Sequence, residues 1–320
     1  MPRDGDWIMQ TKAIRFHDYG GAQVLRFEEI ERPAPKAGEI LVRVHAVSVN
    51  PVDWKIRDGL VRKRFDLPLP VIPGGDLSGE VAAVGAGVTD FAVGQPVFAL
   101  IGLWGAYAEH AAFNASMAAR KPASIDHVHA ASVPLTGLTA WQALQEHGAL
   151  RRGQCVFVHA AAGGVGGFAV QLARAAGADV IASASAKNAD YVRGLGAKEV
   201  IDFRTDSAEP YAGSVDLVID LLGGETSTRS LALLKAGGVL VSVAPPAAAL
   251  QEQAAKLGRR ALGMQVRPDG AQLAQIAALI DTGQVTTTVA AVFPLAEAGA
   301  AQELSKLGHT RGKIILKAVA

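Results

Sequence analysis

The residues best suited to chemistry form a glycine-rich turn near the middle of the chain. Residues 163–169 read Gly-Gly-Val-Gly-Gly-Phe-Ala after a hydrophobic run, and Gly164 to Ala169 fits the pattern G-x-G-x-x-G/A. This pattern is typical of a strand that turns sharply into a helix, with a pyrophosphate against bare backbone at the helix N-terminus. A side chain at position 166 would block that approach. We therefore expect a dinucleotide to bind at Gly163, Gly164, Val165 and Gly166.

The end of the next expected strand indicates which dinucleotide binds. An NAD site usually has Asp or Glu there, about 20 residues after the glycines, bonded to the ribose 2′-hydroxyl. This chain has Ser183, Ser185 and Lys187 instead, and Asp179 precedes the expected strand. Hydroxyl donors and a positive charge suit a 2′-phosphate, so NADPH is the expected cofactor. The alternative for Lys187 is a solvated lysine at the start of a helix.

Two later hydrophobic runs also end in residues expected to line the cofactor site. Asp220 opens the sequence Asp-Leu-Leu-Gly-Gly, and Ala244 follows the run that ends at residue 243. Doubly wound sheets bind ligands in the crevice at the carboxyl ends of their strands. We expect these loops to contribute backbone groups more than side chains.

The pattern of strands and helices changes near residue 125. Before it, short strand-like runs separated by glycine and proline predict a β-barrel or sandwich with one short helix at 51–59. After it, helices alternate with short hydrophobic strands, which predicts a doubly wound parallel sheet. The expected early strands are 12–16, 25–30, 40–49, 81–84, 96–100 and 107–112. The later strands are 155–159, 180–183, 200–201, 215–220 and 239–243, and the helices 130–146, 164–176, 189–195 and 226–234. The tail adds a helix at 272–282 and strands at 285–293 and 313–319, which are expected to complete the first domain.

Composition limits the possible functions. The chain has 320 residues, a formal net charge of +1 from 31 basic and 30 acidic residues, and one cysteine. This length suggests two domains, and the charge balance gives no electrostatic reason to bind nucleic acid or an anionic membrane. One cysteine cannot form an internal disulfide or a Cys-rich zinc site. The first ten residues lack a signal-peptide core. We expect residues 1–8 to be an extension, with Met9 as an alternative start, and the protein to be cytoplasmic.

Several motifs in the same order resemble the medium-chain dehydrogenase/reductases, in their zinc-free quinone oxidoreductase (ζ-crystallin-like) branch. Besides the glycine turn, they are Val49-Asn-Pro-Val-Asp-Trp-Lys-Ile-Arg57, Pro73-Gly-Gly-Asp-Leu-Ser-Gly79, Gly105-Ala-Tyr-Ala-Glu109, Pro134-Leu-Thr-Gly-Leu-Thr-Ala-Trp141 and Gly312-Lys-Ile-Ile-Leu316. The resemblance implies a GroES-like β-barrel domain at 1–130, completed by 267–320, and a Rossmann NADPH-binding domain at 131–266. It also implies a homodimer.

The resemblance further implies that no catalytic zinc is held. Zinc-dependent relatives have metal ligands at positions that correspond to Asn50, Gly75 and Leu135, and these residues do not supply the cysteine or imidazole donors that zinc needs. The eight histidines show no metal-binding spacing, and Cys155 is expected to be a small core residue. We therefore expect no metal site.

Without a metal, the resemblance points to hydride transfer onto a quinone or an α,β-unsaturated carbonyl, where attack gives an enolate-like anion that the protein must stabilise. Asn50 and Lys55 are the residues expected to contact the carbonyl oxygen; the alternative for the Asn50 amide is a bond to the nicotinamide ribose. Thr139 matches a family threonine near the nicotinamide. An exposed lysine on a short helix is the alternative for Lys55, and a hydroxyl bonded to its own helix is the alternative for Thr139. For Asp53 a structural role in capping the turn is favoured.

Two other functions stay open at this stage. A non-enzymatic, redox-sensing NADPH-binding protein would bind the cofactor without turning over any quinone or enone. A zinc alcohol dehydrogenase would contain stoichiometric zinc in spite of the missing ligands.

Overall fold

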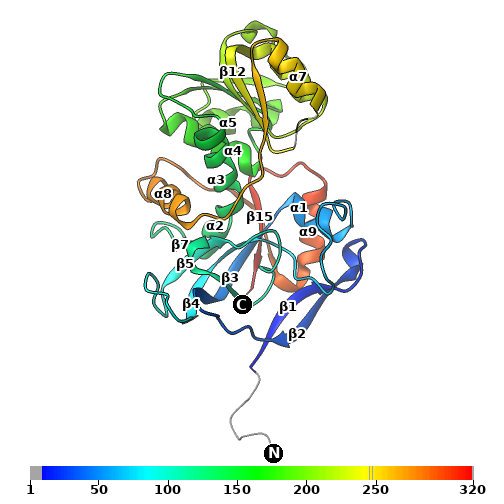
Figure 1. The fold of residues 1–320 in the computed structure, drawn as a ribbon, viewed down its shortest axis with the longest axis vertical. Coiled ribbons are helices and arrows are strands. Elements are labelled where there is room, and N and C mark those ends of the chain that lie inside the picture. The colour runs from blue at the N-terminus through cyan, green and yellow to red at the C-terminus, as the bar shows by residue number, and fades with distance from the viewer. Residues whose placement is uncertain (1–8, 245, 247, 319–320) are drawn as a thin grey trace, which may run out of the picture. The chain divides into compact units, whose positions relative to one another are not determined.

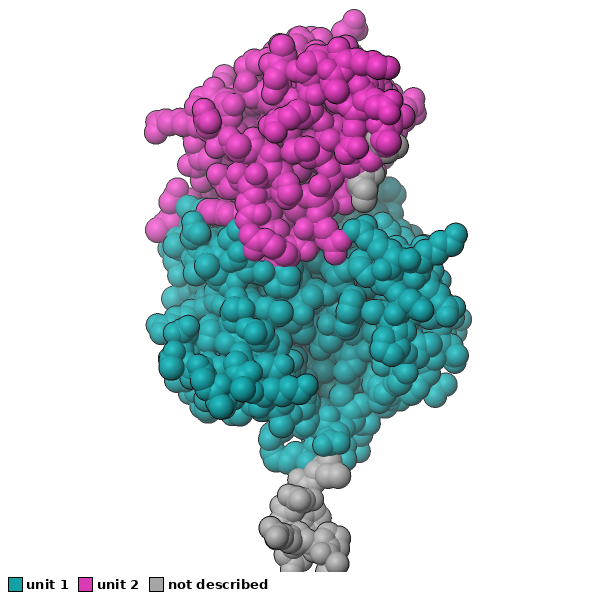
Figure 2. All heavy atoms as spheres, viewed as in Figure 1, with its two compact units in different colours: residues 1–135, 268–281, 287–320 teal, residues 136–267, 282–286 magenta. Residues whose placement is uncertain are grey.

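The computed structural model describes residues 9–244, 246 and 248–318. The expected extension at residues 1–8 and position 319 of the last expected strand lie outside the described residues. The chain divides into two compact units (Figures 1 and 2). Unit 1 contains residues 1–135, 268–281 and 287–320, and unit 2 contains residues 136–267 and 282–286.

Unit 1 is built around a sheet whose longest strand, β3 (Glu39–Val49), pairs with β15, β4 and β6. The sheet has the order β14-β15-β3-β4-β5-β7; β14 and β15 run parallel, and the other pairs are antiparallel. A separate antiparallel pair contains β1 (Gln10–Phe16) and β2 (Leu25–Glu31). The remaining strands are β4 (Asp76–Val84), β5 (Pro96–Leu100), β6 (His110–Asn114), β7 (Ala118–Arg120), β14 (Val289–Pro294) and β15 (Lys313–Lys317). The C-terminal strands therefore complete a sheet that the first third of the chain begins.

The hydrophobic core of unit 1 explains why the C-terminal strands join the sheet of this unit. Val42 and Val44 of β3 are completely buried and pack in one hydrophobic cluster with Leu77 of β4 and Leu316 of β15. β-Branched and aliphatic side chains suit such half-buried pleated surfaces. The helices of this unit are α1 (Pro51–Arg57), α2 (His127–Ala131), α8 (Gly270–Asp281) and α9 (Ala298–Lys306).

Unit 2 contains a six-stranded parallel sheet in the order β10-β9-β8-β11-β12-β13. Its strands are β8 (Cys155–Val158), β9 (Asp179–Ala184), β10 (Glu199–Asp202), β11 (Val215–Asp220), β12 (Leu234–Ser242) and β13 (Arg260–Gly263). The α-helices that lie entirely within it are α4 (Gly164–Ala175), α5 (Ala189–Leu195), α6 (Glu225–Ser230) and α7 (Ala248–Lys256). The expected doubly wound parallel sheet is confirmed. α7, β13 and, in unit 1, β7 and α9 were not expected from the sequence.

Several expected elements have other bounds in the structure. The helix expected at 130–146 is divided into α2, α3 (Pro134–Trp141) and a π-helical segment (Gln142–His147). The break falls at Pro134, which has no N–H for the helical ladder. The helix expected at 226–234 ends as α6 at Ser230, and Leu234 already belongs to β12. The strand expected at 107–112 begins at His110 as β6. Within the described ranges, no helix has the length and apolar character required to span a membrane.

Candidate active site

The glycine-rich turn joins β8 to α4 as the sequence predicts, and the fold itself needs one of its glycines. Gly163 is the N-cap of α4, with an extended backbone and no capping side chain. A Cβ at position 166 would lie 2.4 Å from the carbonyl oxygen of Ala160, a residue in the left-handed region at φ 49°. The first N–H groups of a helix have no intrahelical partner and suit a phosphate. The residues around Gly163–Gly166 therefore fit a bound pyrophosphate.

Gly166→Ala is predicted to disturb this turn. The new methyl group cannot fit beside Ala160, and overpacking of this kind costs about 1–3 kcal/mol of stability. Because the turn must move, NADP(H) affinity should fall by at least about tenfold. Isothermal titration calorimetry and urea unfolding measure the two effects. The matched control is Gly194→Ala in α5, where a Cβ meets nothing within 4 Å; it should bind normally and be equally or more stable. Equal behaviour of the two variants would contradict the prediction.

The three residues expected at the 2′-phosphate have different surroundings. Ser183 is 5% exposed, and its hydroxyl lies 3.2 Å from Nδ1 of His159. Ser185 is 8% exposed, and its hydroxyl accepts a 3.3 Å hydrogen bond from Asn188. Lys187 is exposed. The structure thus leaves the cation of Lys187 at the surface and directs the Ser183 hydroxyl inward.

An acid that sequence reasoning missed lies beside this loop. Asp202 ends β10, opposite Ala184 in the parallel register, and its Oδ2 accepts a 3.1 Å hydrogen bond from the N–H of Ala186. Its other oxygen accepts from the N–H of Arg204 at 3.1 Å. Strand pairing, which sequence spacing does not reveal, brings this carboxylate near the end of β9. Asp179, expected before the strand, is the first residue of β9.

The loop after β11 is organised by Asp220. One carboxylate oxygen accepts hydrogen bonds from the N–H groups of Leu222 and Gly223, and the other accepts a 2.5 Å bond from the hydroxyl of Ser227. Burial alone would raise the pKa of Asp220, but these hydrogen bonds lower it overall. Asp220 therefore holds the shape of its own loop.

The structure places the two other residues predicted at the cofactor, Thr139 and Ala244, but does not test their roles. The N–H of Ala244 donates to the Ser242 hydroxyl at 3.2 Å. Thr139 is 4% exposed on α3. Both roles stay predictions.

Within unit 1, Asn50 and Asp53 define the start of α1. Asn50 is the N-cap, Pro51 follows it, and Oδ2 of Asp53 accepts a 2.8 Å hydrogen bond from the N–H of Asn50. The same oxygen accepts a 2.8 Å bond from the completely buried hydroxyl of Tyr107. The structural role favoured for Asp53 is confirmed.

The side-chain amide of Asn50 is held at both ends. Its Oδ1 accepts a 2.5 Å hydrogen bond from Nζ of Lys313, and its Nδ2 donates at 2.8 Å to Oδ2 of Asp76. Because an ammonium only donates, the amide oxygen must face Lys313. The second hydrogen on Nδ2 has no hydrogen-bond partner among the described residues. Asn50 is 1% exposed, so this donor is preorganised inside the protein.

Asp76 and Lys313 are functional candidates that sequence reasoning did not single out. Asp76 is completely buried; Oδ2 also accepts from the Ser48 hydroxyl at 2.5 Å, and Oδ1 from the N–H of Leu135 at 2.6 Å. Lys313 is 5% exposed and also donates to the carbonyl oxygen of Val49 at 2.7 Å. The available signal was a lysine directly before the hydrophobic run Ile-Ile-Leu of β15.

Burial raises the pKa of one carboxyl group in this network to near 7. Two buried carboxyls, Asp53 and Asp76, share one buried ammonium, Lys313. Burial raises the pKa of Asp53 to about 7, in spite of hydrogen bonds and Lys313, which lower it. Burial also raises the pKa of Asp76 and lowers that of Lys313. Asp53 keeps one buried oxygen, Oδ1, without a partner, which suits a carboxyl that holds a proton.

Asp53→Asn is predicted to remove part of the pH dependence of stability. A carboxyl whose pKa rises on folding stabilises the fold fully below its unfolded value of 3.8, and this contribution is lost as pH rises through about 7. Between about pH 5 and about pH 8, the unfolding free energy of the wild type should therefore fall by roughly 2–3 kcal/mol more than that of the variant. Urea unfolding at both pH values measures this. Asp66→Asn, at a side chain 80% exposed, should follow the wild type. The same pH dependence in Asp53→Asn and wild type would refute the assignment.

Lys55 lies apart from this network. It is exposed on α1, and its Nζ lies 5.5 Å from the centroid of the Trp54 ring. Lys306 places a second ammonium 5.4 Å from the same ring. No described hydrogen bond joins Lys55 to Asn50. The structure therefore places Lys55 at the surface beside Trp54, and its catalytic role stays a prediction.

Comparisons with known proteins identify the family. The family models "Alcohol dehydrogenase GroES-like domain" and "Zinc-binding dehydrogenase" match residues 36–123 and 195–316. The "Chloroplast envelope quinone oxidoreductase homolog" of Arabidopsis thaliana is 33% identical over 321 residues, which cover 95% of this chain and 98% of that protein. The chain belongs to the medium-chain dehydrogenase/reductases, in their quinone oxidoreductase branch.

Further comparisons of this dehydrogenase/reductase support its whole fold. The solved quinone oxidoreductase from Coxiella burnetii is 34% identical, with a TM-score of 0.89, and the match covers 97% of this chain and 99% of that one. The "NADPH-dependent alkenal/one oxidoreductase, chloroplastic" of Arabidopsis thaliana is 32% identical over 324 residues, covering 96% of this chain and 79% of that protein. The expected combination of a GroES-like domain and a Rossmann sheet is confirmed.

Proposed function

We propose that this protein is an NADPH-dependent, zinc-independent reductase of quinones or α,β-unsaturated carbonyls. The observation that carries this proposal is the preorganised amide of Asn50, which keeps one buried donor hydrogen while Lys313 and Asp76 hold the rest of the group. The names of the relatives support nicotinamide-dependent reduction of quinones and of alkenals or enones.

The zinc-independent part rests on residue chemistry. Zinc-dependent relatives have ligands at three positions. At two of them this chain has Leu135, whose side chain is apolar, and Asn50, whose amide oxygen already accepts a hydrogen bond from Lys313. Gly75 has no donor and no room for one, since a Cβ there would lie 2.1 Å from the carbonyl oxygen of Gly102. A catalytic zinc needs three protein ligands with sulfur, imidazole or carboxylate donors. These residues do not fit that metal, and no step of the proposed reaction passes through it.

The proposed reaction needs a hydride, a proton and an oxygen contact. The nicotinamide, when bound, supplies the hydride. The protein must donate hydrogen bonds to the carbonyl oxygen, where negative charge develops. Asn50 offers its free Nδ2 hydrogen, and Lys55 offers an ammonium that can also deliver the proton that completes the reduction. Since Lys313 fixes the amide, Asn50 needs no reorganisation when the charge develops.

The residues present fit the proposed cofactor. The bare turn at Gly163–Gly166 accepts the pyrophosphate. The cation of Lys187 favours a 2′-phosphate, whereas Asp202 is engaged by backbone N–H groups. We assign NADPH over NADH on this basis.

A turnover screen with a Lys55 variant tests the proposed activity. NADPH oxidation should proceed with quinones and enones, proceed poorly with simple aldehydes, and continue in the presence of a metal chelator.

Lys55→Met should lower kcat/KM for an enone by at least about tenfold, because one donor to the developing oxyanion is lost, while NADPH affinity stays nearly unchanged. Lys63→Met, at another exposed lysine, is the control. Unchanged turnover in Lys55→Met would remove Lys55 from the mechanism, and cofactor binding without turnover on any acceptor would favour a non-enzymatic NADPH-binding protein.

Lys187→Ala is predicted to weaken NADPH binding more than NADH binding. Hydrogen bonds to a charged group are worth about 1.5–3 kcal/mol, so NADPH affinity should fall by about tenfold or more while NADH affinity hardly changes. Fluorescence titration with both cofactors measures this. Lys198→Ala removes an exposed lysine that pairs with Asp179, and it should leave both affinities unchanged. Equal losses for the two cofactors in Lys187→Ala would overturn the 2′-phosphate assignment.

A further inference from the structure

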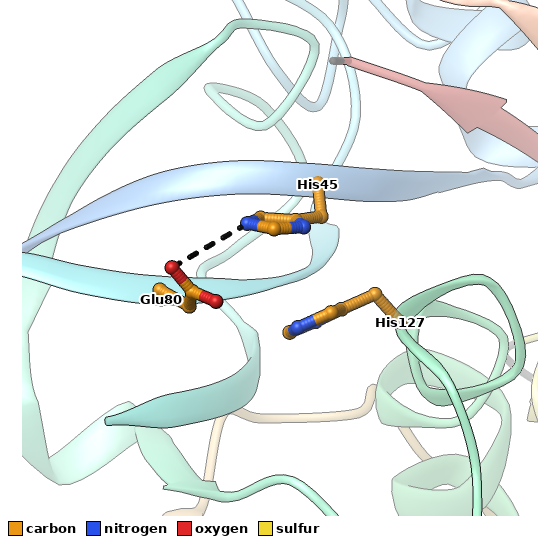
Figure 3. Close-up of side chains that lie close together, drawn as sticks. All are labelled: His45, Glu80 and His127. Carbon is orange, nitrogen blue, oxygen red and sulfur yellow. Dashed lines mark ion pairs between the residues drawn. The ribbon is translucent and has the colours of Figure 1, made fainter. Parts of the chain in front are cut away.

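Three side chains that are distant in sequence meet on the sheet of unit 1. His45 comes from β3, Glu80 from β4 and His127 from the first residue of α2. One potential ligand atom from each lies within 4.8 Å of the other two. Figure 3 shows both imidazoles and the carboxylate directed toward one another. The expectation that the histidines form no metal cluster rested on their spacing in the sequence. The fold brings His45 and His127 together although they are far apart in the sequence.

The backbone of β3 is irregular where it presents His45. Val44 pairs with Gly79 and Ala46 with Ser78, so the register shifts between them and His45 has no residue of its own opposite it on β4. Such a bulge re-aims a side chain and is common near functional sites.

The tautomer of His127 is set by a neighbouring hydroxyl. Oγ of Ser78 donates its one hydrogen to the carbonyl oxygen of Val97 at 3.0 Å, and it also lies 2.8 Å from Nδ1 of His127. Nδ1 must therefore carry the hydrogen of this second bond. In the neutral ring, Nε2 then keeps its lone pair. Metal-ligating histidines typically use one nitrogen for such a supporting bond and the other for the metal.

His45 also has a nitrogen atom available as a metal ligand. Nε2 of His45 is shielded from solvent and makes no hydrogen bond in the described part of the chain; it lies 3.8 Å from Oε2 of Glu80. The rings of His45 and His127 are stacked, with centroids 4.3 Å apart. Two protonated rings would repel at this distance. Burial lowers the pKa of His45, and it lowers that of His127 to about 4, so both rings are neutral near pH 7.

Glu80 supplies the negative charge, and Arg43 competes for it. Nη2 of Arg43 donates to Oε2 of Glu80 at 2.6 Å, and this bond lowers the pKa of the carboxyl. Glu80 is therefore an anion, and its Oε1 has no hydrogen-bond or ion-pair partner in the described ranges of the chain. Arg43 is 48% exposed and can turn toward solvent when the carboxylate takes another partner.

We propose that His45, Glu80 and His127 bind a divalent transition metal of the zinc class. Two imidazoles and one carboxylate are a donor set that suits Zn²⁺, Co²⁺ or Ni²⁺ and does not suit Mg²⁺ or Ca²⁺, which prefer oxygen. Tetrahedral zinc places its ligand atoms about 3.4 Å apart, so small side-chain rotations bring these three into range. Three protein ligands leave one position for water.

The proposed metal would act on the fold of unit 1 and not as the catalytic zinc of the zinc-dependent relatives. It would join β3, β4 and the start of α2. Those elements also carry the active-site candidates: Asn50 follows β3, Asp76 begins β4, and Leu135 lies a few residues after α2. The proposal is independent of the proposed reductase activity.

Metal titration of the full-length protein tests this site. Co²⁺ should bind with one equivalent per chain and give the visible absorption of a four-coordinate site, and Zn²⁺ should displace it. The same titration is made on His45→Gln, Glu80→Gln and His127→Gln, each of which should weaken binding by more than about 100-fold, since even supporting bonds are worth about 10–100-fold. The matched control, His129→Gln, removes a partly exposed histidine two residues away on α2 that pairs with Asp126, and it should bind like the wild type.

Two further variants keep the test decisive if a ligand variant does not fold. Ser78→Ala, which removes the support of His127, should weaken Co²⁺ by about 10–100-fold. Arg43→Gln should strengthen binding, because it frees the Glu80 carboxylate. Absence of stoichiometric binding to the wild type would overturn the proposal. Equal affinity in the wild type, His127→Gln and Ser78→Ala would place the metal elsewhere and overturn it as well.

Discussion

The ammonium of Lys313 is buried in the core of unit 1, and much of the candidate site depends on how it is neutralised. A buried cation is costly unless it is paired and hydrogen-bonded. Here its partners are the backbone oxygen of Val49 and the amide oxygen of Asn50, with the carboxyls of Asp53 and Asp76 close enough to affect its pKa. Since β15 comes from the end of the chain, this requirement links the C-terminal strand to the junction of β3 and α1.

The hydrogen bond from Lys313 also fixes the orientation of the Asn50 side-chain amide. An amide in water can turn either end toward a substrate, but an oxygen held by an ammonium leaves only N–H groups for other partners. Asp76 takes one of these hydrogens and also accepts from the N–H of Leu135. Asn50 is thus held by Lys313 and Asp76 in one hydrogen-bond network, and its one remaining donor hydrogen suits an oxygen that becomes negatively charged.

The sequence predicts those elements and site residues whose determining contacts lie within a few residues along the chain. The turn from β8 to α4, α5 and β11 were predicted nearly to the residue, because glycine chemistry and hydrophobic periodicity act within a few residues. The division of the 130–146 helix at Pro134 was also a local signal, and the expectation overlooked it. Lys313, Asp202 and the His45–His127 pair were missed for another reason. Their partners Asn50, Ala186 and His127 belong to other elements of the chain, and residue spacing in the sequence does not reveal contacts between elements.

β4 shows how one strand can carry two separate kinds of polar site. Asp76, Ser78 and Glu80 alternate along it with Leu77, Gly79 and Val81, which are buried in the sheet. Alternate residues of a strand share a face, so Asp76 in the Asn50 network and Glu80 beside the two histidines belong to one row, with Ser78 between them. Ser78 orients His127 from the middle of this row. Anything that draws Glu80 and His127 together therefore acts on the same strand that holds Asp76, and a metal at the histidines would stiffen that strand without touching the reacting atoms.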